Sequence, residues 1–179
     1  MVRLLLLRHA KSDWSGEAGD HERPLSVRGK KAVPHVAAHM RKQGYQPQAV
    51  LCSTAKRARE TLELLLQRLE VPPAVHYERE LYLAEWPQLL AEIRAAGATS
   101  PLLVVGHNPS LEQLALALAL QPQSPAERAR AEKLAEKFPT AALAALDFEI
   151  ADWSEAKPGS GKLVDYVRPK DLRRRAKQP

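Results

Sequence analysis

An almost unbroken apolar run at residues 2–7, where four consecutive leucines lie between Arg3 and Arg8, constrains the fold most. A strand with one face in water alternates apolar and polar residues, so a continuous run indicates a strand buried on both faces. Such a strand lies inside a sheet that helices cover on both sides. Residues 101–106 form a second run of this kind. We therefore expect an α/β protein.

Helical patterns alternate with strands along the rest of the chain. A helix is expected over 26–44, with Ser26 as N-cap and Gly44 near its end. Further expected elements are helices at 58–69, 87–96, 111–120 and 124–137, strands at 49–52 and 74–77, and a hairpin of 142–151 with 161–167. This order predicts a three-layer α/β/α sandwich around a central, mostly parallel sheet of about six strands.

Length and cysteine content favour one domain in a reducing compartment. A chain of 179 residues with 45% hydrophobic content can build one core without cross-links. Cys52 is the only cysteine, which excludes an intramolecular disulfide. The leucine run is far shorter than the roughly 20 residues of a membrane helix and is a poor signal peptide. We expect a single cytoplasmic domain over 1–179, no membrane partner, and favour a monomer.

The net charge of +6 favours an anionic partner, but much of the excess lies in a basic C-terminal tail at about 168–179. We interpret this tail as a solvated, frayed terminus. Contact with nucleic acid or an acidic membrane is the alternative, although no aromatic residues separate the arginines.

Three polar turns follow predicted strands and should meet at one edge of the sheet. Arg8 and His9 follow the first strand, residues 53–57 the second, and His107 with Asn108 the strand at 101–106. Ligands of α/β sheets usually bind beyond the carboxyl ends of the strands. An imidazole nitrogen there can accept phosphorus while guanidinium groups neutralise its oxygens, so the turns favour phosphoryl transfer without a metal.

Four segments in this order resemble the motifs of the histidine phosphatase superfamily, and more closely its small SixA-type phosphohistidine phosphatase branch. The segments run through most of the chain: residues 7–12 (LRHAKS), 20–29 (DHERPLSVRG), 53–61 (STAKRARET) and 105–109 (VGHNP). The resemblance implies the phosphoglycerate mutase-like form of the α/β/α sandwich, and it implies no cofactor and no metal.

Residue roles follow from this resemblance. His9 would attack phosphorus and become a covalent phosphohistidine that water hydrolyses. The phosphoryl oxygens would be held by Arg8, Arg57 and His107, with Arg23 and Asn108 as further substrate-binding residues. A solvated charge is an equal alternative for Arg23. Asp20 would orient Arg23 or His9, or only stiffen its loop.

The proton donor and the substrate are left more open by the same resemblance. The segment 80–86 is similar to the one that supplies a carboxyl acid in larger relatives, and Glu80 is our choice, with Glu85 second and a plain surface glutamate as the alternative. Long insertions that close the site in larger relatives are missing, which suits a phosphohistidine on a protein. The alternatives are a small-molecule phosphomonoesterase and a noncatalytic phosphoprotein-binding module.

Overall fold

The computed structural model of the protein describes residues 1–175. In this part of the chain the strands are β1 (Val2–Arg8), β2 (Ala49–Ser53), β3 (Ala74–Glu78), β4 (Leu102–Gly106), β5 (Leu143–Phe148) and β6 (Gly161–Val167). The α-helices are α1 (Val27–Lys42), α2 (Lys56–Leu66), α3 (Trp86–Arg94), α4 (Ser110–Leu118), α5 (Pro125–Glu136) and α6 (Pro169–Arg175). Every strand predicted from the sequence is present. None of the described helices is both long enough and apolar enough to cross a membrane.

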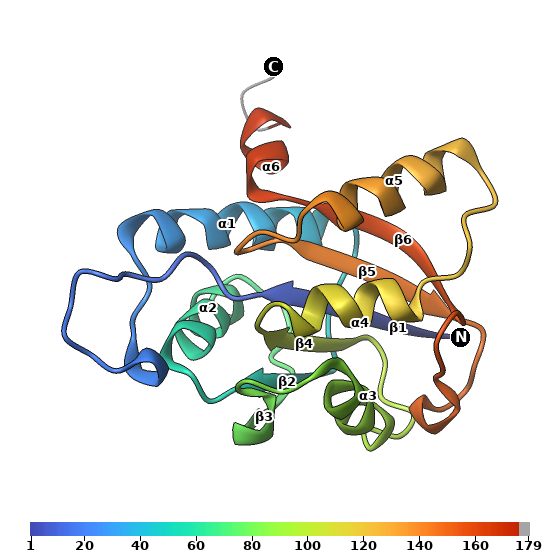
Figure 1. Ribbon diagram of the computed structural model, residues 1–179, viewed down its shortest axis with the longest axis horizontal. Helices are drawn as coiled ribbons and strands as arrows, with labels where there is room; N and C mark the ends of the chain where they lie inside the picture. The colour runs from blue at the N-terminus through green and yellow to red at the C-terminus, as the bar shows by residue number, and fades with distance from the viewer. Residues whose placement is uncertain (176–179) are drawn as a thin grey trace.

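The strands form one sheet in the order β3-β2-β4-β1-β5-β6 (Figure 1). The first four strands are parallel, whereas β5 is antiparallel to both β1 and β6. Because β1 lies between β4 and β5, Leu6 has Val104 on one side and Ala144 on the other. The expected central, mostly parallel sheet with a C-terminal hairpin is confirmed.

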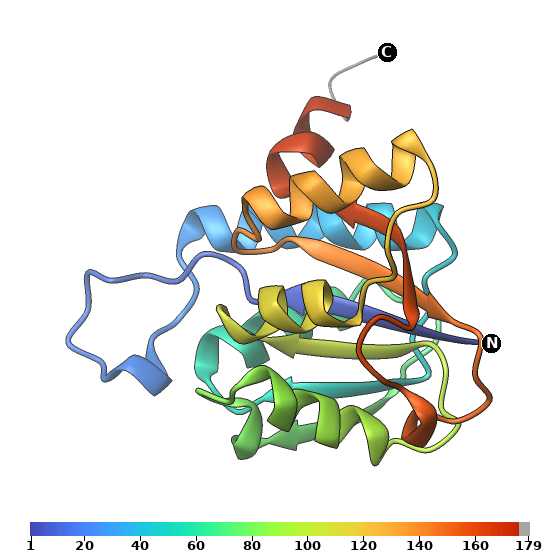
Figure 2. The same cartoon turned by 45° about the vertical axis from the view of Figure 1, so that its right-hand side comes forward.

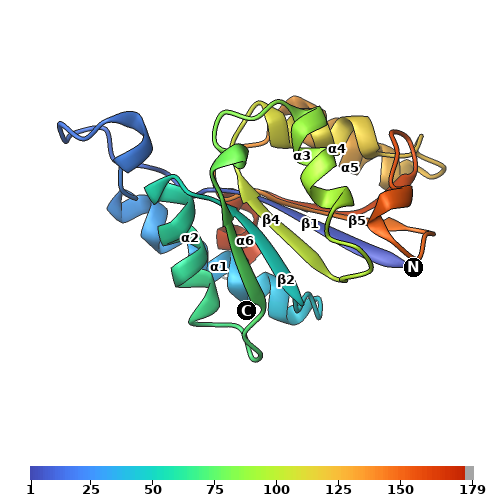
Figure 3. The ribbon, with the colours of Figure 1, turned by 90° about the horizontal axis from the view of Figure 1, so that it is seen from below.

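Helices cover both faces of the sheet (Figure 3). One core cluster packs Leu5 and Leu7 against α1, α2 and α6, and the other packs Leu4 and Leu6 against α3, α4 and α5. All four leucines are at most 1% exposed. The continuous apolar run is thus explained by alternate side chains that enter two separate cores.

The start of α1 packs tightly against the segment that follows His9. Ser26 caps the helix, since its Oγ accepts a hydrogen bond from the Gly29 amide at 3.1 Å. The Ser26 amide and hydroxyl both donate to the Lys11 carbonyl at 2.9 Å. A Cβ on Gly29 would lie 2.1 Å from the same carbonyl oxygen. Only glycine at position 29 permits this approach.

The C-terminal segment differs from the frayed terminus that we expected. Arg168 is 9% exposed and its Nη1 donates to Glu136 at 2.9 Å. Helix α6 follows at once, and Leu172 is buried in the core beside α1. A frayed end is therefore wrong for residues 168–175, because the apolar side chain of Leu172 and the ion pair of Arg168 with Glu136 hold them. Residues 176–179 of the predicted tail lie outside the described residues.

Candidate active site

The three polar turns meet beyond the carboxyl ends of β1, β2 and β4, beside the long loop that leads from β1 to α1 (Figure 2). They border a cavity of about 590 Å³. Its wall contains all six residues that the sequence placed at the site outside the proton-donor segment: Arg8, His9, Arg23, Arg57, His107 and Asn108. Strand order explains this meeting, because β4 lies between β1 and β2.

His9 is held so that one of its ring nitrogens faces Arg57. Its Nδ1 lies 2.8 Å from the Ala10 carbonyl, which can only accept, so Nδ1 carries the proton and Nε2 keeps its lone pair. The Arg57 Nε donates to that Nε2 at 3.3 Å. Burial lowers the pKa of His9 to about 3, and the charges of its neighbours act in the same direction. The imidazole is therefore neutral near pH 7, as a nucleophile must be.

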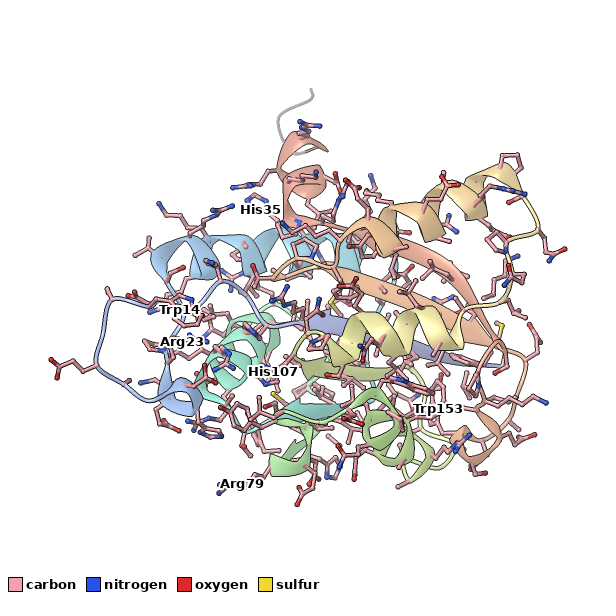
Figure 4. The ribbon with its side chains drawn as sticks, viewed as in Figure 1. Trp14, Arg23, His35, Arg79, His107 and Trp153 are labelled. Atoms are coloured by element: carbon pink, nitrogen blue, oxygen red, sulfur yellow. The ribbon has the colours of Figure 1, made fainter. Side chains whose placement is uncertain are left out.

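His107 faces His9, with the ring centroids 5.0 Å apart, and Figure 4 shows it where β4 ends. Its Nδ1 lies 3.4 Å from Arg57 Nη2, and its Nε2 lies 2.8 Å from the hydroxyl of Ser53. Because a guanidinium only donates, Nδ1 is the acceptor and Nε2 carries the proton of the neutral ring. Burial is again the largest cause that lowers its pKa to about 3.

Arg57 connects both imidazoles to Asp20. It lies in the first turn of α2 and is 5% exposed. Its Nη1 donates to the Asp20 carbonyl at 2.6 Å, and its Nη2 donates to the carboxylate at 3.1 Å. The carboxylate also accepts from the Tyr82 hydroxyl at 2.6 Å, which is the largest cause of the lowered pKa of Asp20. The guanidinium is thereby fixed in the plane that faces the cavity.

Arg8 and Asn108 share one anchor on the other side of the cavity. The Phe138 carbonyl accepts from Arg8 Nη1 at 2.8 Å and from Asn108 Nδ2 at 3.1 Å. Burial lowers the pKa of Arg8. Arg8 Nε and Asn108 Oδ1 are both buried without a hydrogen-bond partner among the described residues. A buried unpaired donor beside a cavity is suited to an incoming oxyanion.

Arg23 is buried, with 9% exposure, although a solvated charge was an equal expectation. Its guanidinium stacks on Trp14 with Cζ 3.3 Å from the ring centroid, and its Nη2 pairs with Asp20 at 2.8 Å. Figure 4 shows both residues on the loop between β1 and α1. Asp20 thus orients two arginines and acts on His9 only through Arg57.

In the proton-donor segment, the glutamate that reaches the cavity is not the one that we chose from the sequence. Glu80 lies in the short helix Arg79–Leu81, where it is exposed and is not part of the cavity wall. Figure 4 shows its neighbour Arg79 at the far side of the molecule from α6. Glu85, our second choice, does line the cavity. Its backbone amide donates to the Gln88 side chain at 3.0 Å at the start of α3. The position of Glu80 does not support it as the acid.

Sequence reasoning missed three supporting side chains. Thr61 Oγ1 accepts from the Ala10 amide at 3.0 Å and donates to the Arg57 carbonyl at 2.6 Å. Ser53 and Tyr82 position His107 and Asp20 as described above. Thr61 and Ser53 lie in the segment 53–61 that resembles a family motif, so the sequence already indicated that they are near the site. Nothing in the sequence linked Tyr82 to Asp20. Within residues 1–175 no group of three or more His, Cys, Asp or Glu could hold a metal ion.

Comparison with known proteins places this chain in one family. The sequence profile of the histidine phosphatase superfamily (branch 1) matches residues 4–131. An uncharacterised protein of Mycobacterium tuberculosis is 36% identical over 165 residues, which cover 92% of this chain and 100% of the relative. An uncharacterised chloroplastic protein of Arabidopsis thaliana is 30% identical over 182 residues, covering 93% of this chain and 78% of the relative.

Two solved structures have the same fold. One, from Nakamurella multipartitia, is provisionally named phosphohistidine phosphatase SixA; it is 28% identical with a TM-score of 0.80 and covers 94% of this chain and 96% of its own. The other, from Agrobacterium tumefaciens, carries the same provisional name; it is 28% identical with a TM-score of 0.77 and covers 94% and 98%. The residues that the family profile matches, 4–131, include all four motifs.

Proposed function

Because the chain belongs to the histidine phosphatase superfamily, we propose that it hydrolyses phosphoryl groups from histidine residues of proteins through a phospho-His9 intermediate. The observation that carries the proposal is the pairing of Arg57 Nε with the unprotonated Nε2 of His9. A neutral imidazole surrounded by guanidinium groups attracts an anionic phosphoryl group and can attack it.

In the first step, Nε2 of His9 forms a bond to phosphorus while the bond from phosphorus to the substrate nitrogen breaks. The departing nitrogen keeps the electron pair and takes up a proton from solvent water. Arg8, Arg57 and His107 stabilise the charge that spreads over the three equatorial oxygens. In the second step, water attacks the phospho-His9, inorganic phosphate leaves, and the neutral His9 is restored. No metal or other cofactor enters these steps.

The open form of the cavity favours a protein-borne phosphoryl group. Trp14 and Leu83 line it and are 70% and 75% exposed, so its rim is accessible to a large partner. An imidazole is also a better leaving group than an alkoxide, which lowers the need for a strong acid. The provisional names of the two similar structures give the same activity. The proposal includes a cytoplasmic location, in which the enzyme would have access to proteins phosphorylated on histidine.

The test is a single-turnover reaction with a phosphorylated histidine-containing phosphotransfer domain. Wild-type protein should release phosphate and yield acid-labile phosphate on His9 after rapid quenching. His9→Ala should do neither, whereas the control His76→Ala, changed on exposed β3, should behave as wild type. The proposal fails if the wild type leaves a panel of phosphohistidine proteins intact while it hydrolyses small esters.

A small-molecule phosphomonoesterase is the second candidate, and the place of Glu85 in the cavity wall favours it. An ester needs its alkoxide leaving group protonated, and a carboxyl group at the wall can supply that proton. A noncatalytic phosphoprotein-binding module would bind without turnover. Tight binding together with no trapped phosphohistidine would identify it.

A further inference from the structure

A second cavity, of about 510 Å³, lies between α1 and α6 and adjoins the active site. Lys11 and Thr140 line both cavities, so the two adjoin at these residues. We call the second cavity the basic groove and define it by Lys11, Arg28, Lys31, His35 and Arg173; the apolar residues Val27 and Ala32 also line it. Figure 4 shows His35 on α1 below α6.

The basic groove carries positive charge without local compensation. Lys11, Arg28, Lys31 and Arg173 are exposed, and among the described residues that line the groove none is acidic. Helix α1 contains no Asp or Glu at all. Asp171, the one acid of α6, is turned away and bonds Lys133 at 2.7 Å and the Arg168 amide at 3.0 Å. Lys11, Arg28 and Lys31 form no ion pair with a carboxylate in the described part of the chain.

The placement of these cations opposes the stability of their own helix. Arg28 and Lys31 lie in the first five residues of α1, next to the positive end of the helix dipole. Acidic side chains are the ones that stabilise a helix at this end. Two unpaired cations there serve the fold poorly, and this points to a role outside it.

We propose that the basic groove binds acidic side chains on the surface of the phosphoprotein whose phosphohistidine enters the active site. This inference rests on the proposed function and adds the chemistry of the partner surface. A protein that inserts its phosphohistidine between Arg8 and Arg57 must lie against the rim of the cavity. At this rim the groove offers unpaired cations beside exposed apolar surface. Acidic side chains of a protein complement the cations, and apolar side chains of the same protein can cover Val27.

A protein face fits the groove better than a small polyanion. The cations come from three separate segments, and their side chains are exposed. They can therefore attract a large charged surface, but they do not enclose a small anion. Val27 is 70% exposed at the groove and offers apolar contact that a phosphate chain does not use. Such rim charges typically raise the association rate and its dependence on salt.

The test compares the double variant Arg28→Glu/Lys31→Glu with the control Arg128→Glu/Lys157→Glu, which has the same change in net charge at exposed positions outside the groove. The substrate is an acidic phosphotransfer domain phosphorylated on histidine. We expect the groove variant to lose about tenfold in kcat/KM and most of its salt dependence, while the control stays near wild type. Both should hydrolyse para-nitrophenyl phosphate at the wild-type rate.

A stability measurement separates docking from a structural role. The groove variant should unfold at the same or a higher temperature than wild type, because the new glutamates favour the helix dipole. Arg28→Ala/Lys31→Ala serves as a second variant and should show a smaller loss of kcat/KM.

Equal kcat/KM of the groove and control variants on the phosphoprotein would overturn the docking inference alone. A wild type that fails on phosphohistidine proteins would overturn the proposed function instead. If short polyphosphates inhibit the wild type, and the groove variant loses that inhibition but keeps full phosphoprotein turnover, the groove binds small polyanions and the inference is wrong.

Discussion

Arg57 Nε donates to His9 Nε2 at 3.3 Å, so the nitrogen proposed to attack phosphorus already faces the guanidinium proposed to receive the phosphoryl oxygens. The same guanidinium also contacts His107 and donates to both the backbone carbonyl and the carboxylate of Asp20. One side chain therefore sets the spacing of His9, His107 and Asp20.

We expect Arg57→Lys to lower kcat by about 100-fold or more, the effect typical of losing one transition-state donor. Lysine keeps the charge but cannot contact His9, His107 and Asp20 at once, because it lacks the planar fork. Steady-state kinetics on para-nitrophenyl phosphate measure this loss. Arg59→Lys, two residues along the same helix, is the control and should keep nearly full activity.

Gly29→Ala should damage both fold and activity. The new Cβ would lie 2.1 Å from the Lys11 carbonyl oxygen, so either α1 or the segment after His9 must move. We expect the free energy of unfolding to fall by about 1–3 kcal/mol, as in other overpacked sites, with a parallel loss of kcat. Urea unfolding measures the first effect. Gly16→Ala is the control, since nothing lies within 4 Å of the added atom.

Tyr82→Phe should reduce kcat several-fold and leave stability almost unchanged. The lost hydroxyl removes one of the two donors to Asp20 Oδ2, the oxygen that also accepts from Arg57. Tyr82 is thus a positioning residue, and Asp20→Asn should reproduce its effect and exceed it. Tyr77→Phe on β3 is the matched control. A Tyr82→Phe protein with wild-type kcat would show that Arg57 needs no such support.

Acid should destabilise the protein through its two site histidines. Their pKa values of about 3 in the folded state lie below the value of about 6.5 expected when unfolded, so the unfolded chain binds more protons between these limits. Their contribution to stability is complete above about pH 6.5 and decreases as the pH falls towards 3.

Each histidine should remove up to about 2 kcal/mol of unfolding free energy between pH 7 and pH 5. Urea unfolding at both pH values measures the difference. His9→Asn and His107→Asn should each lose less stability than wild type over this interval. An identical loss in all three proteins would contradict the neutral, buried state of the two rings.

Glu85→Gln and Glu80→Gln should separate the two carboxyl candidates. Because Glu85 lines the cavity and Glu80 does not, only Glu85→Gln should slow ester hydrolysis, by about 10-fold to 100-fold. Phosphohistidine hydrolysis should change much less in either variant, because imidazole leaves without strong acid assistance. A selective loss of ester hydrolysis in Glu80→Gln would restore our first choice.

The sequence predicted the parts of the fold that rest on local patterns. The leucine run identified β1 as a central strand, and the three polar turns identified Arg8, Arg57 and His107 as neighbours, because strand ends in a parallel sheet share an edge. Prediction was weaker where single side chains decide the outcome. Leu172, together with the bond from Arg168 to Glu136, anchors a segment that its charges suggested was frayed.

Contacts between loops that are distant in the sequence could not be predicted, for a different reason. The pairing of Tyr82 with Asp20 depends on the path of two loops 62 residues apart, and no periodic pattern records that path. Glu80 and Glu85 stand in the same loop, so composition could not tell which one faces the cavity. The turn of the short helix Arg79–Leu81 decides it.

The hydroxyl of Thr61 has a consequence for how this site can evolve. The Thr61 hydroxyl accepts from the Ala10 amide at 3.0 Å and donates to the Arg57 carbonyl at 2.6 Å. His9, which precedes Ala10, and Arg57 therefore belong to one rigid body built from the end of β1 and the start of α2. The loop between β1 and α1 joins that body at Asp20, which accepts hydrogen bonds from Arg57. Descendants of this chain can recharge the exposed stretch at residues 15–18 to acquire new substrates, provided that Asp20 keeps its place beside Arg57.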